Sequence, residues 1–301
     1  MSNVFDGKFF ANQYYLLLKN FLIYHDLVGK ISLKVILAND SPASKLYVSV
    51  KERVSKEIGI HFNVIRLAEN LGQDDILKLI EAENVNEFTD GIIVQLPIAT
   101  EMNVNVVLNS ILNTKDVDGL SAINLGKLIL GDKRGFIPCT ALAVLKVLFD
   151  REIEVSGKTV VLVGRSSLVG RPISILLSCK PYNATVITCH SKSVNLGAYV
   201  RQADIIISAV GKPNLISANM ISGHQYVIDI GISRVEINGE TVLVGDVDFE
   251  SIKDNVKFIT PVVGGIGPVT VLMLMFNTIK AHLIRHYKFD VLEKLEKLVE
   301  V

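Results

Sequence analysis

The chain has 301 residues, of which 49% are hydrophobic, and its 31 basic side chains balance its 31 acidic ones. This length accommodates one large or two ordinary domains, and the hydrophobic fraction is sufficient for a large core. The even charge balance, with no basic block, argues against a nucleic-acid-binding protein, which would carry a basic patch.

The cysteines and the N-terminal residues indicate the compartment. Cys139, Cys179 and Cys189 show no CxxC spacing, which argues against a disulfide framework or a zinc ribbon and favours a reducing cytoplasm. The opening MSNVFDGKFFANQ has no basic region followed by an apolar run, so we expect no signal peptide. The apolar run at 269–276 is far shorter than the ~20 residues that cross a bilayer, so we expect no membrane association.

Short β-branched runs alternate with amphipathic stretches in the first half of the chain. An opening helix is expected at about 8–28. The expected strands are LKVILAN (33–39), FNVIRLA (62–68) and DGIIVQLP (90–97), with helices at about 43–58 and 73–84 between them. This β-α-β-α-β order predicts a parallel sheet with helices on its faces.

A second series follows from about residue 138. A helix is expected at 138–150. The expected strands are 158–164, 184–189, 203–211, 225–231 and 256–261, all near-continuous apolar runs of the kind found in buried parallel sheets. A long helix at about 268–288 follows. We therefore predict an α/β fold with two α/β domains and a cleft between them, the second domain being a Rossmann-like doubly wound parallel sheet.

The predicted domains are residues 1–137 and 138–288, with the helix at about 268–288 packing back onto the first. Residues 289–301 form an extra amphipathic segment, because Leu292, Leu295 and Leu298 share one helical stripe. We expect this helix to dock on its own domain; a docking site on a second subunit is the alternative.

The stretch VVLVGRSSLVGRPIS (160–174) indicates a phosphate cradle. It predicts a strand, a turn that contains Gly164 and Gly170, and the start of a helix whose free N–H groups face an anion. The spacing is not GxGxxG, because Ser166 stands where a second glycine would be. A tight turn without a ligand would have the same pattern.

The end of the next strand bears on which dinucleotide binds. A domain that binds NAD usually has an acidic residue there, but TCHSK (188–192) has none. Ser191 and Lys192 are hydrogen-bond donors, and Arg165 lies in the glycine turn. Three donors and no acid favour NADP over NAD. In the alternative, Lys192 is solvated and Arg165 is the only contact.

A tyrosine and a lysine in KLYVSVKER (45–53) suggest a reactive site. Tyr47 and Lys51 are four residues apart on a predicted helix, so both can contact one ligand. The alternative is a surface lysine beside a half-buried tyrosine. Other candidate segments are QLP (95–97) at a strand end, KDVDG (115–119) with two carboxylates, and GGIGP (264–268) before the last helix. Taken singly, Asp116 could simply cap a helix and the glycines could simply form a turn.

Taken together, these segments resemble the bifunctional methylenetetrahydrofolate dehydrogenase/cyclohydrolases. The resemblance extends in order from residue 6 to about 288. The matching segments are DGK (6–8), SPASKLYVSVK (41–51), DGIIVQLP (90–97), KDVDGLSAINLGKL (115–128), FIPCT (136–140), GRSSLVGRP (164–172), CHSK (189–192), VGKP (210–213), DIGI (229–232), VGDVDF (244–249) and TPVVGGIGPVT (260–270). Ala99 and Val263 depart from the family pattern, which has prolines there.

The resemblance implies a folate-binding catalytic domain followed by an NADP-binding domain, NADP as cofactor, tetrahydrofolate derivatives as substrates, and a homodimer. It implies that Lys51 is the catalytic lysine, with Gln95 as its hydrogen-bond partner. The implied catalytic residues are Lys51, Tyr47, Gln95 and Asp118. The implied substrate-binding residues are Tyr47, Gln95, Leu96, Pro97, Asp118, which would bind the pterin ring, and Gly265. The implied cofactor-binding residues are Gly164, Arg165, Ser166, Gly170, Ser191 and Ile232.

The implied reactions are the NADP-dependent oxidation of 5,10-methylenetetrahydrofolate to the 5,10-methenyl form and its hydrolysis to 10-formyltetrahydrofolate. Hydride loss leaves a cation shared by two nitrogens, so the first step requires no strong base. The second step moves protons, and Lys51 can assist only if its pKa falls from about 10.4 toward neutrality. A dehydrogenase without the second activity and a non-catalytic folate- or nucleotide-binding protein are the alternatives.

Two further patterns have simpler explanations. His282 and His286 form HxxxH on the last helix, but no HExxH core accompanies them, so we expect a solvated helix face and predict no metal. Cys139 is expected to be a buried small residue, because no histidine accompanies it in the sequence pattern.

Overall fold

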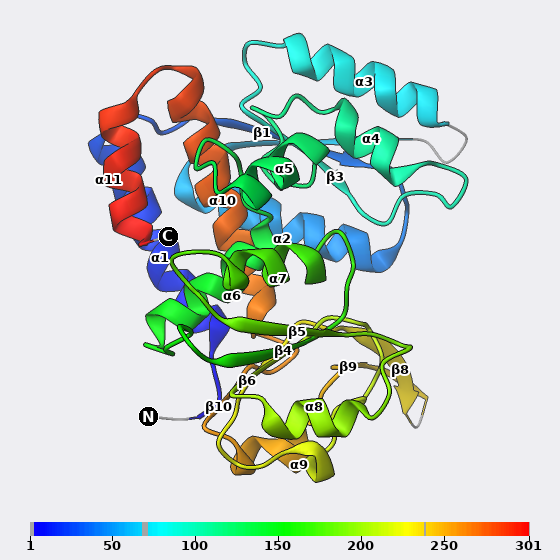
Figure 1. Cartoon of the computed structure of the whole chain (residues 1–301). Helices are drawn as coiled ribbons and strands as arrows, with labels where there is room; N and C mark the ends of the chain where they lie inside the picture. The colour runs from blue at the N-terminus through cyan, green and yellow to red at the C-terminus, as the bar shows by residue number, and fades with distance from the viewer. Residues whose placement is uncertain (1–2, 68–71, 238, 301) are drawn as a thin grey trace. The chain divides into compact units, whose positions relative to one another are not determined.

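The computed structural model describes residues 3–67, 72–237 and 239–300 (Figure 1). The chain divides into two compact units. Unit 1 comprises residues 1–11 and 140–270, and unit 2 comprises residues 12–139 and 271–301. Both contain parallel sheets covered by helices, so the expectation of two α/β domains is confirmed.

Unit 2 contains a three-stranded parallel sheet in the order β2-β1-β3. Its strands are β1 (Ser32–Leu37), β2 (His61–Arg66) and β3 (Gly91–Gln95), all at positions expected from the sequence. The predicted strand over 62–68 ends earlier, and residue 68 lies outside the described residues. Leu33, Val35 and Ile36 of the central strand are fully buried, as expected for a strand with neighbours on both sides.

Helix α2 (Pro42–Ile58) connects β1 to β2, and local signals in the sequence fix both of its ends. The Ser41 side chain accepts a hydrogen bond from the Ser44 N–H at the first turn, and Pro42 occupies a position where its missing N–H costs nothing. Gly59 ends the helix in the left-handed conformation, with φ 95°. The helix is thereby held in phase with β3, toward which it directs Lys51.

The remaining helices of unit 2 complete its core. They are α1 (Gly7–Tyr24, beginning in unit 1), α3 (Gln73–Val85), α4 (Val104–Ser110), α5 (Ala122–Leu130), α10 (Ile266–Arg285, beginning in unit 1) and α11 (Phe289–Val299). Helix α10 is long and apolar enough to cross a membrane, but 78% of its most apolar window is buried inside the protein. Helix α11 buries Leu295 and Val299, and Glu296 lies 3.4 Å from the Lys280 amine of α10. This helix therefore packs on its own unit.

Unit 1 contains a five-stranded parallel sheet in the order β10-β7-β6-β4-β5. The strands are β4 (Thr159–Val163), β5 (Thr185–Cys189), β6 (Ile205–Ser208), β7 (Tyr226–Asp229) and β10 (Phe258–Ile259). Its helices and short 3₁₀ turns are α6 (Cys139–Asp150, with Cys139 in unit 2), α7 (Gly170–Ser178), α8 (Leu196–Gln202), α9 (Phe249–Ile252), η1 (Ala218–Met220) and η2 (Lys253–Asn255). The chain leaves β4 toward β5 on one side and returns to β6 on the other, so the end of β4 is the topological switch point where ligands bind in such sheets.

One element of unit 1 was not expected from the sequence. Strands β8 (Ser233–Ile237) and β9 (Glu240–Val244) form an antiparallel hairpin. The run SRVEI alternates polar and apolar residues, as half-exposed strands do, whereas the expected strands were identified as continuous apolar runs.

Candidate functional site

Lys51 and Gln95 form a direct pair in unit 2. The Lys51 amine on α2 donates a hydrogen bond of 2.9 Å to the Gln95 side-chain oxygen at the end of β3. The Gln95 amide nitrogen donates in turn to the Leu96 carbonyl at 2.8 Å, which fixes the orientation of the amide. The lysine is thus held by a neutral acceptor rather than by a carboxylate, an arrangement that does not favour its charged form strongly.

Asp118 is the ionisable neighbour of this lysine. Loss of hydration lowers the pKa of the Lys51 ammonium, while the Asp118 carboxylate acts in the opposite direction. Loss of hydration likewise raises the pKa of Asp118, and Lys51 opposes that shift. Because burial is the larger cause for both groups, the site favours an amine that gives up its proton more readily than a solvated lysine does.

Asp116 holds the loop that presents Asp118. Its carboxylate accepts hydrogen bonds from the backbone N–H groups of Gly119 at 3.1 Å and Ser121 at 2.8 Å, and from the Asn124 side-chain amide at 2.8 Å. Gly119 has a φ of 72°, and a Cβ there would lie 2.7 Å from the Phe136 carbonyl oxygen. Asp116 therefore stabilises the loop, whereas Asp118 is the carboxylate of KDVDG that is predicted to bind the substrate.

Two residues that the sequence analysis did not assign to the site hold the segment around Asp118. The buried Cys139 thiol donates to the Val117 carbonyl at 3.3 Å and hydrogen-bonds the Asp118 side chain. The Asn277 amide of α10 donates to the carbonyls of Val117 at 2.9 Å and Ile137 at 3.1 Å. A buried asparagine within the apolar run VTVLMLMFNTIK was the only sequence signal for this support. Burial raises the pKa of Cys139 well above its usual range, so Cys139 is a neutral donor and not a nucleophile.

Three further predicted substrate residues lie on the same elements. Tyr47 is 40% exposed one helical turn before Lys51. Leu96 and Pro97 follow β3 through a cis peptide bond, and the Asn39 side chain donates to the Pro97 carbonyl at 2.6 Å. Leu96 and Pro97, with Gln95, lie at the carboxyl end of β3, whereas Tyr47 lies on α2.

Gly265 belongs to unit 1, unlike the other predicted substrate residues. It is buried just before α10, and a Cβ there would lie 2.0 Å from the Pro261 carbonyl oxygen. This tight contact explains the glycine, and a role toward a substrate stays a prediction.

The glycine turn of unit 1 is as tightly built as the sequence predicts. Gly164 has a φ of 125°, and a Cβ there would lie 2.5 Å from the Ala209 carbonyl oxygen. A Cβ on Gly170 would lie 2.4 Å from the Gly164 carbonyl oxygen. The backbone can therefore follow this tight path only because both side chains are absent.

The N–H groups at the start of α7 are not all free as the sequence predicted, because Ser166 occupies two of them. Its hydroxyl oxygen accepts hydrogen bonds from the N–H groups of Val169 at 3.2 Å and Gly170 at 3.4 Å. These two donors are already occupied, so an anion at this turn depends more on side chains such as Arg165 than the motif alone suggests.

Arg165 and Ser191 follow neighbouring strands. Val163 of β4 is paired with Cys189 of β5, and each predicted ligand residue lies two positions further along the chain. Both side chains are exposed at the same edge of the sheet. Ser191 belongs to a turn in which the Ser193 N–H donates to the His190 carbonyl at 2.8 Å. The structure thus places the two proposed phosphate contacts on adjacent loops, with Lys192 exposed beside them.

Two buried carboxylates, missed by the sequence analysis, hold the other loops at this edge. Asp246 accepts hydrogen bonds from the Ser208 hydroxyl at 2.8 Å and from the N–H groups of Val210 at 2.7 Å and Lys212 at 2.8 Å. Asp229 accepts from the N–H of Val247 at 2.9 Å, and burial raises its pKa to about 7.

This pair fixes the path of the chain near Ile232, the last predicted cofactor contact, which is 40% exposed. A Cβ on Gly231 would meet the Asp246 carboxylate at 2.1 Å. In the sequence, Asp229 of DIG and Asp246 of GDVD were the only indication of this pair. Their proximity follows from the fold and could not be predicted from either segment.

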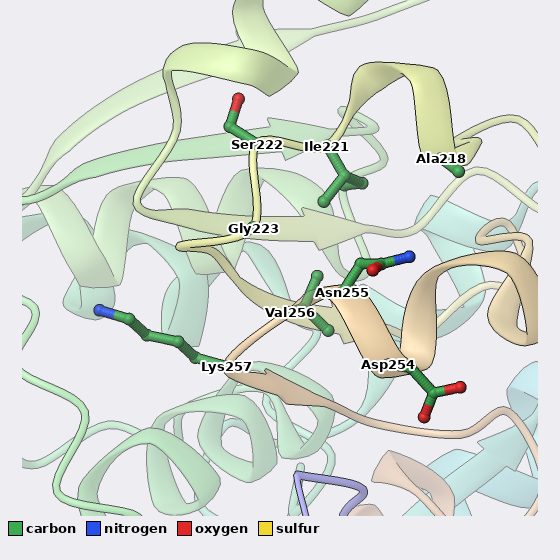
Figure 2. Close-up of a pocket in the computed structure, with 8 residues that line it drawn as sticks. All are labelled: Ala218, Ile221, Ser222, Gly223, Asp254, Asn255, Val256 and Lys257. Atoms are coloured by element: carbon green, nitrogen blue, oxygen red, sulfur yellow. The ribbon is translucent and has the colours of Figure 1, made fainter.

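A separate cavity of about 510 Å³ lies elsewhere in unit 1 (Figure 2). Its lining includes Gly223, Asn255 and Lys257, which precede β7 and β10. It therefore lies at the amino ends of these parallel strands, whereas the glycine turn follows the carboxyl end of β4. The cavity is not part of the candidate cofactor site.

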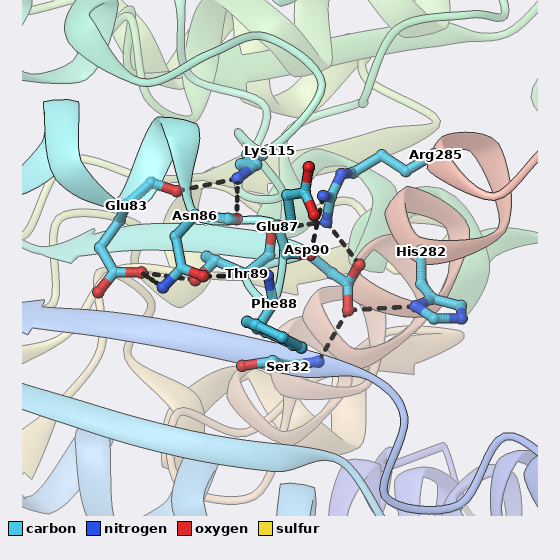
Figure 3. A network of polar contacts seen from close by, with 10 residues as sticks. All are labelled: Ser32, Glu83, Asn86, Glu87, Phe88, Thr89, Asp90, Lys115, His282 and Arg285. Carbon is cyan, nitrogen blue, oxygen red and sulfur yellow. Dashed lines mark hydrogen bonds and ion pairs between the residues drawn. The ribbon is translucent and has the colours of Figure 1, made fainter.

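Asp90, His282 and His286 form a third polar cluster in unit 2. The expectation of a solvated face is wrong for His282, which is 5% exposed and has its Nδ1 3.2 Å from an Asp90 carboxylate oxygen (Figure 3). Asp90 also pairs with Arg285 at 2.7 Å. The cluster lies at the start of β3, away from Gln95 at its end.

Comparisons with known proteins identify the families that the two parts of the chain match. Residues 5–118 match the family described as tetrahydrofolate dehydrogenase/cyclohydrolase, catalytic domain, and residues 138–286 match tetrahydrofolate dehydrogenase/cyclohydrolase, NAD(P)-binding domain. The chain is 67% identical over 301 residues to the bifunctional protein FolD of Borrelia garinii, with 100% of both chains covered.

Two solved structures are similar throughout. The bifunctional enzyme FolD from Campylobacter jejuni is 41% identical, with a TM-score of 0.89, and the match covers 95% of this chain and 100% of that one. The Trypanosoma brucei methylenetetrahydrofolate dehydrogenase-cyclohydrolase, complexed with NADP cofactor and inhibitor, is 32% identical with a TM-score of 0.89, over 95% of this chain and 98% of that one.

Proposed function

Because the chain belongs to the tetrahydrofolate dehydrogenase/cyclohydrolase family, we propose which of its side chains perform the two reactions of that family. The protein is a bifunctional enzyme of one-carbon folate metabolism. It oxidises 5,10-methylenetetrahydrofolate to the 5,10-methenyl form with NADP and hydrolyses this product to 10-formyltetrahydrofolate. The family resemblance expected from the sequence is confirmed.

In the dehydrogenase step, the protein holds and orients the folate. NADP, when bound, accepts the hydride from the one-carbon bridge. The cation that remains is shared by two ring nitrogens, so no strong base is required, and positioning within the ~3–3.5 Å near-attack range supplies most of the catalysis. Asp118 accepts hydrogen bonds from the amino-amide edge of the pterin, and Tyr47 packs on the folate.

In the cyclohydrolase step, Lys51 acts as the general base and acid that transfers the proton. The observation that carries this assignment is the 2.9 Å hydrogen bond from Lys51 to the neutral Gln95, together with the lowered pKa of the amine. A neutral amine can take a proton from the water that attacks the methenyl carbon and return it as the ring opens. The cationic substrate lowers the pKa of this lysine further, because like charges disfavour protonation.

The cofactor site is assigned to the glycine turn and its neighbours. The two glycines allow a tight turn between β4 and α7 that would bring its backbone close to a cofactor phosphate, and Ser166 supports the turn. Arg165 and Ser191 would hold the 2′-phosphate that distinguishes NADP from NAD. The backbone near Ile232 would also contact the cofactor.

We extend the proposal to the organisation of the protein. The folate-binding domain is assigned to residues 1–137, with the helix at about 268–288 packed back onto it, and the NADP-binding domain to the rest of 138–288, with Gly265 contributing to the substrate site; in the structure residues 1–11 instead group with 140–270. The cleft between them stays a prediction. The protein acts in the cytoplasm, which its three free cysteines support, and as a homodimer, which rests on the family resemblance.

The substitution Lys51→Met tests the central assignment. Methionine keeps the length of the side chain but removes the proton carrier. We expect the cyclohydrolase rate to fall roughly a hundredfold or more, while folate binding is retained. Spectrophotometric assays of methenyl hydrolysis and of NADPH formation measure the two steps separately.

Lys56→Met is the matched control, because Lys56 is exposed on the same helix and pairs with Glu52. This variant should retain both activities. Full cyclohydrolase activity in Lys51→Met would refute the assigned role. A wild-type protein that oxidises the folate but never hydrolyses it would instead support the monofunctional alternative.

A further inference from the structure

The cluster of Asp90, His282 and His286 has no role in the proposed reactions. Asp90 directly precedes β3, and Gln95 ends that strand, so the two lie roughly 16 Å apart along it. His282 is on the last turn of α10, and His286 follows it. Any function of this cluster is therefore separate from proton transfer at Lys51.

The contacts of Asp90 leave one lone pair directed at His282. One carboxylate oxygen pairs with Arg285 at 2.7 Å. The other accepts the Ser32 N–H at 2.9 Å and lies 3.2 Å from the His282 Nδ1. Among the described residues, this buried Nδ1 has no partner with hydrogen-bond geometry. The His282 Nδ1 and the Asp90 oxygen thus lie at ion-pair distance inside the protein, but the geometry between them is not that of a hydrogen bond (Figure 3).

This separation is close to that of two ligands on one metal ion. Ligand bonds of about 2.1 Å at a tetrahedral angle place nitrogen and oxygen about 3.4 Å apart. The observed 3.2 Å would require only a small adjustment. A hydrogen bond would instead require the N–H to point at the oxygen, which the ring orientation does not provide.

His286 supplies a third ligand atom. It is four residues after His282, and the two ring centroids are 4.3 Å apart. One atom from each of the three side chains lies within 4.8 Å of the other two. His286 is exposed, so an ion could reach the buried pair from solvent. A cavity of about 580 Å³ borders the three residues and can hold a water as fourth ligand.

Positive charges nearby oppose a cation, but each has another partner or remains solvated. Arg285 occupies the other oxygen of Asp90 and also donates to the Thr89 carbonyl at 2.6 Å. Lys30 is paired with Asp26, and Lys288 is exposed. Glu87, which also borders the cavity, adds a negative charge.

We propose that Asp90, His282 and His286 bind one divalent transition-metal ion, with Zn²⁺ as the preferred member of that class. Two imidazoles and one carboxylate suit Zn²⁺, whereas Mg²⁺ and Ca²⁺ require mainly oxygen ligands. The ion would connect the end of α10 to the start of β3, and so serves stability rather than the folate reactions.

Isothermal titration of the untagged, EDTA-stripped full-length protein with ZnCl₂ tests the proposal. We expect one equivalent of Zn²⁺ to bind per chain and to raise the melting temperature, whereas MgCl₂ should do neither. Co²⁺ bound at the same site should give the visible absorption of a tetrahedral centre. His286→Ala should weaken Zn²⁺ binding at least roughly tenfold, because it removes a ligand from an exposed position.

His224→Ala is the control, since His224 is an exposed histidine in unit 1. His282→Asn provides a second ligand variant, and circular dichroism shows whether it folds. The proposal requires weak binding in both ligand variants and unchanged binding in His224→Ala. Equal affinity in His286→Ala and the wild type, or no Zn²⁺ binding by the wild type, would overturn it.

Discussion

The ammonium of Lys51 gives up hydration without gaining a carboxylate in hydrogen-bond contact, and this sets its chemistry. Gln95 holds the amine at 2.9 Å as a neutral acceptor, while Asp118 moderates the fall in pKa from a position beside it. A carboxylate in place of Gln95 would favour the ammonium and suppress proton transfer. The choice of a neutral partner is therefore part of the proposed mechanism.

Arg165→Ala tests the cofactor assignment at the same scale. The guanidinium is exposed beside the glycine turn, where it would pair with the 2′-phosphate of NADP. We expect the Michaelis constant for NADP to rise at least roughly tenfold, a loss of ~1.4 kcal/mol, and that for NAD to change little. Steady-state dehydrogenase assays with each cofactor measure both values.

Arg134→Ala controls for the loss of one surface guanidinium, because Arg134 pairs with Asp132 in unit 2. Lys192→Ala tests whether Lys192 also contributes to binding the 2′-phosphate of NADP. A parallel rise in both Michaelis constants for Arg165→Ala would mean that the arginine contacts a part of the cofactor common to NAD and NADP.

Single residues were predictable where a local pattern carried them. The four-residue spacing placed Tyr47 and Lys51 on one helix face, whereas the pairing of Lys51 with Gln95, which the structure contains, was implied by the family resemblance. Asn277 was not predictable as a support for Asp118, since its contact with Val117 joins residues 160 positions apart. His282 was assigned wrongly for the same reason, because its partner Asp90 is remote in the sequence.

At the level of elements, β4, the glycine turn and α7 form one tightly packed strand–turn–helix motif. The turn brings the start of α7 so close to Gly164 that Gly170 has no room for a side chain. Ser166 then occupies two N–H groups of the first turn. A tight backbone path, rather than a row of free donors, is what the motif encodes.

Gly170→Ala should disrupt this element. The added Cβ would lie 2.4 Å from the Gly164 carbonyl oxygen, so the turn and the helix must separate. We expect a loss of ~1–3 kcal/mol in the free energy of unfolding and weaker NADP binding. Urea unfolding followed by circular dichroism, which suits a chain without tryptophan, measures the first effect.

Gly126→Ala is the matched control in the interior of α5, because a Cβ there would meet nothing within 4 Å. It should be neutral or stabilise the protein by up to about 1 kcal/mol. Unchanged stability and cofactor affinity in Gly170→Ala would show that the turn can relax.

Elements with a strong period were predicted well. Continuous apolar runs identified the strands of both parallel sheets, and the helix expected at about 43–58 agrees with the observed α2. The hairpin β8–β9 was missed because its stability comes from pairing across a turn rather than from burial on both faces.

For the whole molecule, charge and burial determine how stability responds to pH. The formal net charge is zero at pH 7, so overall self-repulsion is small near neutrality. Individual groups with shifted pKa values then dominate. Asp229 and the histidines His25 and His286, whose pKa values are lowered mainly by loss of hydration, act in opposite directions. Comparing the wild type with one variant separates them.

Asp229→Asn isolates the carboxyl group. Burial raises the pKa of Asp229 to about 7, well above the 3.8 of an exposed aspartate. Between about pH 4 and 7 the unfolded chain therefore releases a proton that the folded chain keeps. The free energy of unfolding of the wild type should fall, relative to that of Asp229→Asn, by up to ~1.4 kcal/mol per pH unit as the pH rises. Urea titrations of both proteins across this range measure the difference, in which the shared histidine contributions cancel. A difference that grows with pH in favour of the wild type would mean that the three backbone N–H donors around Asp229 outweigh its burial and hold it ionised.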